Sequence, residues 1–349
     1  MLKKLLLLTL LGTAFAAQAE AAAPSTYRDI ARLRAMNQRT QGIRPAADGK
    51  SYTTLRGNAI ERHSYTKDAP GELLFEWKND KENRDIADYQ FSPDGKLLLL
   101  SIGSEPIYRH SYTTDYYLKD ADGLRPILTD LPGTRDASFS PDGRTIAFSS
   151  GNNLYLYDIV GDSVRPITTD GVWNRIINGT TDWVYEEEFG FNRAFDFSAD
   201  SQMLAYIRFD ESQVPMYSFP LYKGMVPALE KFSTYPGEYE YKYPMPGIDN
   251  SKVTVHTFDI KSKVTRKMDL PLDADSYIPR IKFTDDENAL AIMTLNRHQN
   301  RFDLYFANPR STLCKLMVRD EAPQYIKEEA YSNIVFYPKN FVVMSEKDG

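Results

Sequence analysis

Phe-Ser-Pro-Asp-Gly-Lys at residues 91–96, followed by an apolar run at residues 97–100, decides the fold because the same pattern returns along the chain. Residues 139–144 read Phe-Ser-Pro-Asp-Gly-Arg and are also followed by an apolar run. Two altered copies come later, Phe-Ser-Ala-Asp-Ser at residues 197–201 and Phe-Thr-Asp-Asp-Glu at residues 283–287. Proline presets φ and glycine accepts a positive φ, so each Pro-Asp-Gly predicts a tight turn that joins two strands.

The spacing of these copies indicates the architecture. Counted from phenylalanine to phenylalanine, the copies lie 48, 58 and 86 residues apart. A further strand is expected at residues 153–158, and a similar sequence recurs at residues 302–307. Aromatic residues make up 13% of the chain, which favours strands over helices. Repeats of roughly 40–50 residues with about four strands each are typical of β-propeller blades, so the sequence predicts an all-β propeller. A solenoid of hairpins is the structural alternative.

Composition excludes one class of partner. The 349 residues carry a formal net charge of −6, and lysines and arginines do not cluster. An acidic chain without a basic patch argues against a nucleic-acid partner. Cys314 is the single cysteine, so no disulfide can form within the chain.

The first residues read as a secretion signal. Lys3 and Lys4 precede a short apolar run at residues 5–17, and Ala-Gln-Ala at residues 17–19 is a small-residue cleavage pattern. We expect residues 1–19 to be a signal peptide cleaved after Ala19, with an uncleaved anchor as the alternative. The mature protein would then be periplasmic or secreted, with no membrane span.

The rest of the chain divides into three parts. Residues 20–41 form a helical lead-in, with a short helix expected at residues 25–39, and residues 42–349 form the propeller. Residues 233–250 are rich in Tyr, Pro and Gly and interrupt the repeats, so we expect an inserted arm that serves as an interface, or else a long solvated loop. The last expected strand, at residues 341–344, has no partner strand after it. This predicts an incomplete propeller and a fragment of a longer protein.

One acidic stretch carries the functional signal. Residues 182–189 read Asp-Trp-Val-Tyr-Glu-Glu-Glu-Phe, with three consecutive carboxylates beside large aromatic side chains. Like charges near apolar surface are costly unless a cation meets them, and a ligand ammonium group is one candidate. An acidic loop tip is the plainer interpretation. Adjacent residues on a strand point to opposite faces, so two of the carboxylates can share a cavity only if the segment coils. We therefore expect a short helix at residues 183–189.

A second stretch carries a candidate arginine. Residues 108–112 read Tyr-Arg-His-Ser-Tyr and fall in a turn between two expected strands. Arg109 offers a planar guanidinium suited to a carbonyl or carboxylate, although a single loop arginine is usually only a solvated charge.

Together these motifs resemble those of the dipeptidyl peptidase IV family, a branch of the prolyl oligopeptidase superfamily. The acidic stretch, preceded by Asn-Gly at residues 178–179 and followed by Phe-Asp-Phe-Ser at residues 195–198, looks like the family's glutamate motif. Arg-His-Ser-Tyr-Thr at residues 109–113 matches its arginine loop, and residues 209–219 match the segment after the glutamates. The resemblance extends over residues 42–349.

The resemblance implies a function for the whole enzyme. Such enzymes place an eight-bladed propeller over a C-terminal α/β-hydrolase domain with a Ser-Asp-His triad, and they act as homodimers. They remove dipeptides from peptides that have a free N-terminus and Pro or Ala at the second position. Within this pattern Glu187 and Glu188 would bind the substrate's α-ammonium group and Arg109 a substrate carbonyl, while Glu186 should matter much less.

This sequence lacks the chemistry of the hydrolase domain. It has no Gly-x-Ser-x-Gly motif, so we expect no catalytic residues in this chain and no peptidase activity from it alone. Its four histidines show neither triad nor metal-ligand spacing, so no cofactor or metal is implied. The sequence therefore predicts the amine-binding propeller of a secreted serine dipeptidyl peptidase. A stand-alone periplasmic propeller that acts as a binding or scaffold protein is the alternative.

Overall fold

The computed structural model describes residues 41–78, 81–224 and 228–347. The signal segment with its cleavage after Ala19, and the helix expected at residues 25–39, lie outside the described residues. Over the described ranges the chain is built almost wholly from strands, which confirms the all-β class. No helix in this part of the chain is long and apolar enough to span a membrane.

Four-stranded antiparallel sheets are the repeating unit, and in the first three the strands pair in sequence order. The first sheet contains β1 (Gln41–Pro45), β2 (Ser51–Arg56), β3 (Ala59–Ser64) and β4 (Glu72–Glu76). The second contains β5 (Ile86–Phe91), β6 (Leu98–Pro106), β7 (Tyr112–Lys119) and β8 (Leu124–Ile127). The third contains β9 (Arg135–Phe139), β10 (Thr145–Ser150), β11 (Asn153–Asp158) and β12 (Ser163–Pro166).

The fourth sheet departs from this pattern in one respect that matters for function. The fourth sheet contains β13 (Ile176–Asn178), β14 (Phe195–Phe197), β15 (Met203–Asp210), β18 (Lys252–Asp259) and β19 (Val264–Lys267). Both β13 and β14 pair with β15, so the first strand of this sheet is split in two. The helix α3 (Trp183–Phe189) lies in the interruption. The interruption inserts a helix into the blade, while β13 and β14 both stay paired with β15 and keep the sheet intact.

The described chain ends with a fifth complete sheet and one further strand pair. The fifth sheet contains β20 (Tyr277–Phe283), β21 (Leu290–Leu295), β22 (Arg301–Ala307) and β23 (Cys314–Glu321). It is followed by the short helix α4 (Glu329–Ser332) and by the pair β24 (Val335–Phe336) and β25 (Phe341–Val342). The strand expected at residues 341–344 is shorter in the structure, since β25 covers only Phe341–Val342, and it pairs with the preceding β24.

The Pro-Asp-Gly turns join the first two strands of a sheet, as predicted. Between β5 and β6, Gly95 N donates to Ser92 O at 2.8 Å, and Gly95 has a φ of +71°. Ser92 Oγ donates to Asp94 Oδ1 at 2.7 Å and accepts from Leu97 N at 2.9 Å. In the third copy Ser201 replaces the glycine and keeps the positive φ, at +59°, a conformation that non-glycine residues adopt at some cost. The turn geometry thus survives where the sequence pattern is degraded.

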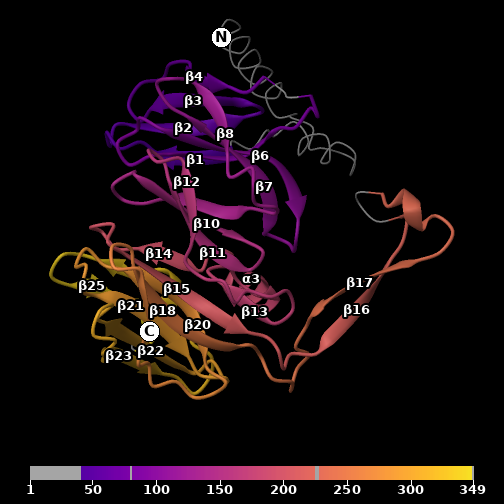
Figure 1. Ribbon diagram of the computed structural model, residues 1–349. Helices are drawn as coiled ribbons and strands as arrows, with labels where there is room; N and C mark the ends of the chain where they lie inside the picture. The colour runs from indigo at the N-terminus through magenta and orange to yellow at the C-terminus, as the bar shows by residue number, and fades with distance from the viewer. Residues whose placement is uncertain (1–40, 79–80, 225–227, 348–349) are drawn as a thin grey trace, which may run out of the picture.

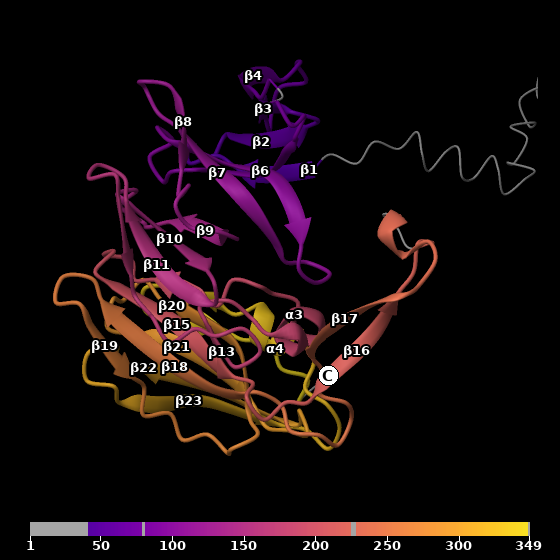
Figure 2. The same cartoon turned by 45° about the vertical axis from the view of Figure 1, so that its right-hand side comes forward.

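Neighbouring sheets pack side by side and are tied by hydrogen bonds between them. Ala137 N on β9 donates to Tyr116 Oη on β7 at 3.1 Å. Phe283 N on β20 donates to Asp196 Oδ2 on β14 at 2.8 Å. Figures 1 and 2 show the sheets following one another along an arc, with the chain running from one end of the arc to the other. This is the arrangement of successive blades in part of a β-propeller.

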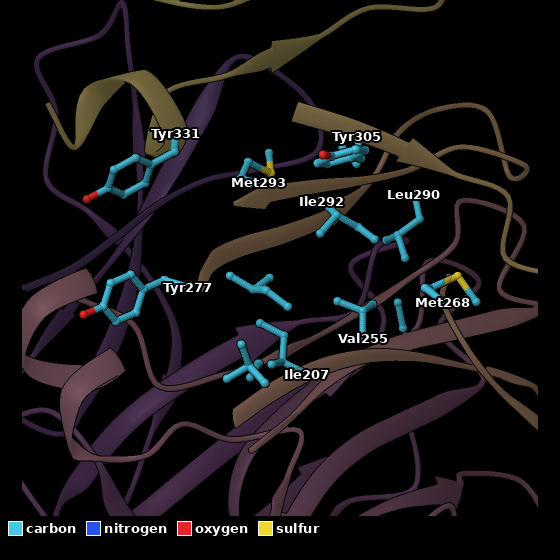
Figure 3. Packing of buried hydrophobic residues seen from close by; sticks show 14 of the residues in the cluster. Ile207, Val255, Met268, Tyr277, Leu290, Ile292, Met293, Tyr305 and Tyr331 are labelled. Carbon is cyan, nitrogen blue, oxygen red and sulfur yellow. The ribbon is translucent and has the colours of Figure 1, made fainter. Parts of the chain in front are cut away.

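The largest buried cluster lies between the fourth and fifth sheets (Figure 3). Ile207 from β15 and Val255 from β18 face Leu290 and Ile292 from β21, and each of these side chains is at most 1% exposed. Burying an aliphatic side chain of this size stabilises a fold by about 1.5–3 kcal/mol. The same cluster includes Tyr185 and Phe189 of α3, so the core of two blades fixes the helix in place.

A hairpin projects from the fourth sheet. Its strands are β16 (Met216–Leu221) and β17 (Gly237–Lys242), with a short 3₁₀ helix, η1 (Glu230–Phe232), between them. Figures 1 and 2 show it extending away from the blades. The arm expected at residues 233–250 covers only the returning half of this hairpin. The expected arm did not include β16, which reads Met-Tyr-Ser-Phe-Pro-Leu, because most of this strand was matched to the segment after the glutamates at residues 209–219.

Candidate functional site

The helix α3 forms where the acidic stretch predicts it, because both of its ends carry strong local signals. Asp182 has an extended backbone and its Oδ1 accepts from Tyr185 N at 3.0 Å, as an N-cap does. Its Oδ2 accepts from Ser251 Oγ at 2.5 Å. Gly190 ends the helix with a φ of +65°. The expected helix at residues 183–189 is confirmed with the same bounds.

The helix sends the three glutamates in different directions. Successive residues on an α-helix are rotated by about 100°. Glu186 is completely buried, with an exposed fraction of 0%. The Glu187 side chain is 15% exposed, and Glu188 is exposed. Only the last two carboxylates are therefore accessible to a ligand.

Arg109 lies against this helix although it is far away in sequence. It belongs to the arginine loop, which we define as residues 107–111 between β6 and β7. Arg109 Nε donates to Glu187 Oε2 at 2.7 Å, and the arginine side chain is otherwise 70% exposed. A loop of the second sheet thus places the guanidinium of Arg109 against α3, the helix that interrupts the fourth sheet. The three residues predicted for substrate binding lie in one place.

The buried glutamate contacts the same loop through its backbone. Glu186 Oε1 accepts from His110 N at 2.6 Å and from Ser111 N at 2.8 Å. Within the described residues, Glu186 Oε2 is buried without a hydrogen-bond partner. Glu186 therefore faces the arginine loop and not the exposed side of the helix.

Aromatic side chains from the projecting hairpin border the site. The ring of Trp183 on α3 lies 4.4 Å from that of Tyr243 and 6.3 Å from that of Tyr241. The ring of Tyr108, in the arginine loop, lies 5.3 Å from that of Tyr241. Tyr239 Oη on β17 donates to Ile107 O in the loop at 3.3 Å. The base of the arm is thus part of the site. This role is not predicted by the sequence, although the tyrosine content of the arm is a signal for it.

A pair of buried acids lies beneath the site and was also missed. Glu211, directly after β15, is 4% exposed, and burial together with the nearby charge of Asp182 raises its pKa to about 8. Burial likewise raises the pKa of Asp182 above its usual range. Burial and the neighbouring Glu211 raise the pKa of Tyr108. Glu211 lies within residues 209–219, but an isolated Glu after a strand gives no sequence signal for burial.

The histidines are not grouped. His63 Nε2 and Thr54 Oγ1 lie 3.1 Å apart, and His256 Nε2 and Thr254 Oγ1 lie 3.0 Å apart. Burial lowers the pKa of His256 to about 4, so this ring is neutral at pH 7. Across the described ranges, no three His, Cys, Asp or Glu side chains are placed to hold a metal ion. The chemistry available at the site is that of paired carboxylates and one guanidinium.

Comparison with known proteins identifies the family. The family model described as the dipeptidyl peptidase IV (DPP IV) N-terminal region matches residues 92–349. The dipeptidyl peptidase 4 of Trichophyton equinum is 34% identical over 234 residues, which are 64% of this chain and 29% of that protein. The probable dipeptidyl peptidase 4 of Aspergillus flavus is 34% identical over 230 residues, which are 62% of this chain and 28% of that protein. The chain thus spans less than a third of the length of these relatives.

Solved structures agree on the fold. The crystal structure of Porphyromonas gingivalis dipeptidyl peptidase 4 matches with a TM-score of 0.83 at 37% identity, over 94% of this chain and 46% of that one. A putative dipeptidyl aminopeptidase IV from Bacteroides ovatus matches with a TM-score of 0.62 at 19% identity, over 89% of this chain and 42% of that one, and shows a likeness of fold alone. The solenoid alternative is thereby excluded. This chain belongs to the dipeptidyl peptidase IV family and carries its N-terminal β-propeller region.

Proposed function

We propose that this chain is the substrate-binding propeller of a secreted serine dipeptidyl peptidase. Glu187 and Glu188 bind the free α-ammonium group of a peptide, and Arg109 binds a substrate carbonyl. The peptides have Pro or Ala at the second position, and the hydrolase chemistry belongs to a further domain of a longer, homodimeric protein.

The observation that carries this proposal is the 2.7 Å contact between Arg109 Nε and Glu187 Oε2. It joins two motifs that are 78 residues apart, at a place where a second carboxylate, Glu188, is exposed. One guanidinium balances one of the two accessible carboxylates. This leaves a net charge of one negative unit, which a single ammonium group would balance. Charge-assisted hydrogen bonds of this kind are roughly twice as strong as neutral ones.

An amine-binding site also explains a dipeptide product. An exopeptidase has to hold the free N-terminus at a fixed distance from its nucleophile, so that one particular peptide bond is cleaved. When the amine is fixed on α3 and the first carbonyl on Arg109, only one peptide bond can reach a nucleophile held elsewhere in the protein. Binding at the propeller therefore sets the position of cleavage.

The test is steady-state kinetics on the full-length protein with an Xaa-Pro anilide. Glu187→Gln and Glu188→Gln each remove one charge that faces the ammonium group. Losing a charged hydrogen bond to a desolvated ammonium costs about 2–4 kcal/mol in transition-state binding, so kcat/KM should fall roughly thirty-fold to several hundred-fold. Glu287→Gln, in the exposed turn between β20 and β21, is the matched control and should leave kcat/KM as in the wild type.

The same series can contradict the proposal. Glu186→Gln should lose far less activity than the other two changes, because Glu186 does not face the accessible side of α3. If Glu186→Gln is the damaging change while Glu187→Gln and Glu188→Gln stay near wild type, the assignment of the amine site is wrong. Thermal melting of each variant separates a loss of binding from a loss of folding.

Two simpler observations test the wider proposal. A reading frame that continues beyond codon 349 into Gly-x-Ser-x-Gly supports the peptidase, whereas a stop codon there favours a stand-alone propeller that acts as a binding or scaffold protein. N-terminal sequencing of the protein recovered from the periplasm or medium should begin at Glu20, since the proposal places signal cleavage after Ala19.

A further inference from the structure

We propose that Glu186 is a positioning residue, which holds the arginine loop in the shape that brings Arg109 to Glu187. This inference rests on the amine-binding site proposed above. It assigns a separate task to the one glutamate of the three that does not face a ligand.

The contacts of Glu186 are those of an anchor. The side chain is completely buried, and Oε1 accepts from His110 N at 2.6 Å and from Ser111 N at 2.8 Å. These two amides directly follow Arg109 in the chain, so fixing them fixes the backbone from which the guanidinium extends. A buried carboxylate that accepts from two amides forms strong, short hydrogen bonds, and leaving those amides unpaired would be costly.

The other hydrogen bonds that restrain the loop are weaker, and the ring of Tyr108 contacts Tyr241 on the arm. Ile107 N donates to Ser111 O at 2.9 Å and closes the five-residue turn, but this bond lies within the loop and does not attach it to α3. Tyr239 Oη donates to Ile107 O at 3.3 Å from an exposed position on the arm. Arg109 itself is largely exposed, so its ion pair with Glu187 is partly screened by solvent. Glu186 is therefore the main link between the loop and the helix.

Two substitutions of Glu186 distinguish the length of its side chain from its charge. Gln at position 186 has the length of Glu and keeps one oxygen for both amides. Its amide nitrogen would take the place of Oε2, which has no hydrogen-bond partner within the described residues and so gives up no bond. Asp at position 186 keeps the charge but is one methylene shorter and cannot reach both amides. An anchor requires that Glu186→Gln be mild and Glu186→Asp damaging, whereas a role in neutralising a ligand charge requires the reverse order.

The direct test is amide hydrogen exchange of the full-length protein, read by mass spectrometry on peptides that cover residues 107–113. Glu186→Asp should speed exchange in these peptides at least about tenfold, and Glu186→Gln by no more than about threefold. Tyr239→Phe, which removes the weaker restraint, should have a smaller effect than Glu186→Asp. Peptides from the first and fifth sheets should keep wild-type protection in every variant. This readout does not depend on catalysis, so it stands even if the proposed peptidase function fails.

A second test uses activity in the full-length protein. Glu186→Asp should lower kcat/KM by about tenfold or more, mainly through KM, because it displaces the group that binds substrate. The double variant Glu186→Asp with Arg109→Gln should be no worse than Arg109→Gln alone, since both changes remove the same contact.

Four outcomes would overturn the proposal. The first is wild-type exchange at residues 107–113 in Glu186→Asp. The second is faster exchange there in Glu186→Gln than in Glu186→Asp, which would make the charge decisive. The third is an equal loss of protection throughout the chain in both variants, which would assign Glu186 to general stability. If the losses in kcat/KM caused by Glu186→Asp and Arg109→Gln multiplied in the double variant, Glu186 would act independently of Arg109, and the proposal would also fail.

Discussion

Replacing Glu211 with glutamine should remove a destabilising effect of high pH on this chain. Glu211 is 4% exposed, and its carboxyl group lies near the buried Asp182. Lys242 lies close enough to offset part of the charge, and its Nζ donates to Val214 O at 2.5 Å. Burial and the charge of Asp182 outweigh Lys242, so the pKa of Glu211 rises to about 8 in the folded chain.

The sign and size of the effect follow from this pKa. The ordinary value is 4.5, so between pH 4.5 and about 8 the unfolded chain releases a proton that the folded chain keeps. Rising pH therefore favours unfolding through this interval, and the stabilisation present below pH 4.5 is lost by about pH 8. A shift of this size sets a ceiling of about 5 kcal/mol, and relaxation around the buried charge should reduce the measured effect to about 2–4 kcal/mol.

The assay is urea unfolding of the wild type and Glu211→Gln at pH 5, 7 and 9, followed by tryptophan fluorescence. The free energy of unfolding of the variant relative to the wild type should increase by about 2–4 kcal/mol from pH 5 to pH 9, because glutamine does not titrate. Glu287→Gln, which is exposed, should show no such trend. A difference between Glu211→Gln and wild type that stays constant across this range would refute the reasoning, since Glu211 would then titrate normally in the folded chain.

Two further predictions concern the whole protein. Replacing residues 222–236 of the arm with a two-residue turn, in the full-length protein, should convert the proposed homodimer into a monomer by light scattering, while β17 keeps Tyr239 and Tyr241 beside the arginine loop. An unchanged dimer mass would rule out the arm as the dimer contact. Residues 1–349 alone should release no chromophore from a Gly-Pro or Ala-Pro anilide, because their sequence contains no Gly-x-Ser-x-Gly motif. Release above a no-protein control would contradict this.

Local signals were enough to predict the blades and the helix α3. The Ser-Pro-Asp-Gly turns encode their own hydrogen bonds, from Ser92 Oγ to Asp94 and from Gly95 N to Ser92 O, so they can be recognised without any long-range information. The helix follows from a cap at Asp182 and a stop at Gly190. Both kinds of signal act over a few residues, which is why the sequence predicts them well.

Long-range packing was the part that the sequence did not predict. The contacts of Glu186 with the arginine loop span 76 and 75 residues, and nothing local distinguishes this glutamate from the next two. The burial of Glu211 depends on how β15 packs beside Asp182. The contact from Tyr239 to Ile107 spans 132 residues and joins the arm, which projects from the fourth sheet, to a loop of the second sheet. Each of these depends on the arrangement of blades and not on a pattern within one blade.

The three consecutive glutamates differ in task because a short helix is fixed on one side by the core. A helix of seven residues is not stable alone in water, so α3 depends on its Asp182 cap and on the burial of Tyr185 and Phe189. That burial fixes the rotation of the helix about its own axis. With the rotation fixed, Glu186 points inward, where the backbone amides of His110 and Ser111 donate to it, while Glu188 points to solvent. A change that let α3 rotate would therefore disturb the loop anchor and both accessible carboxylates together, whereas a change at Glu187 or Glu188 leaves the anchoring hydrogen bonds of Glu186 in place.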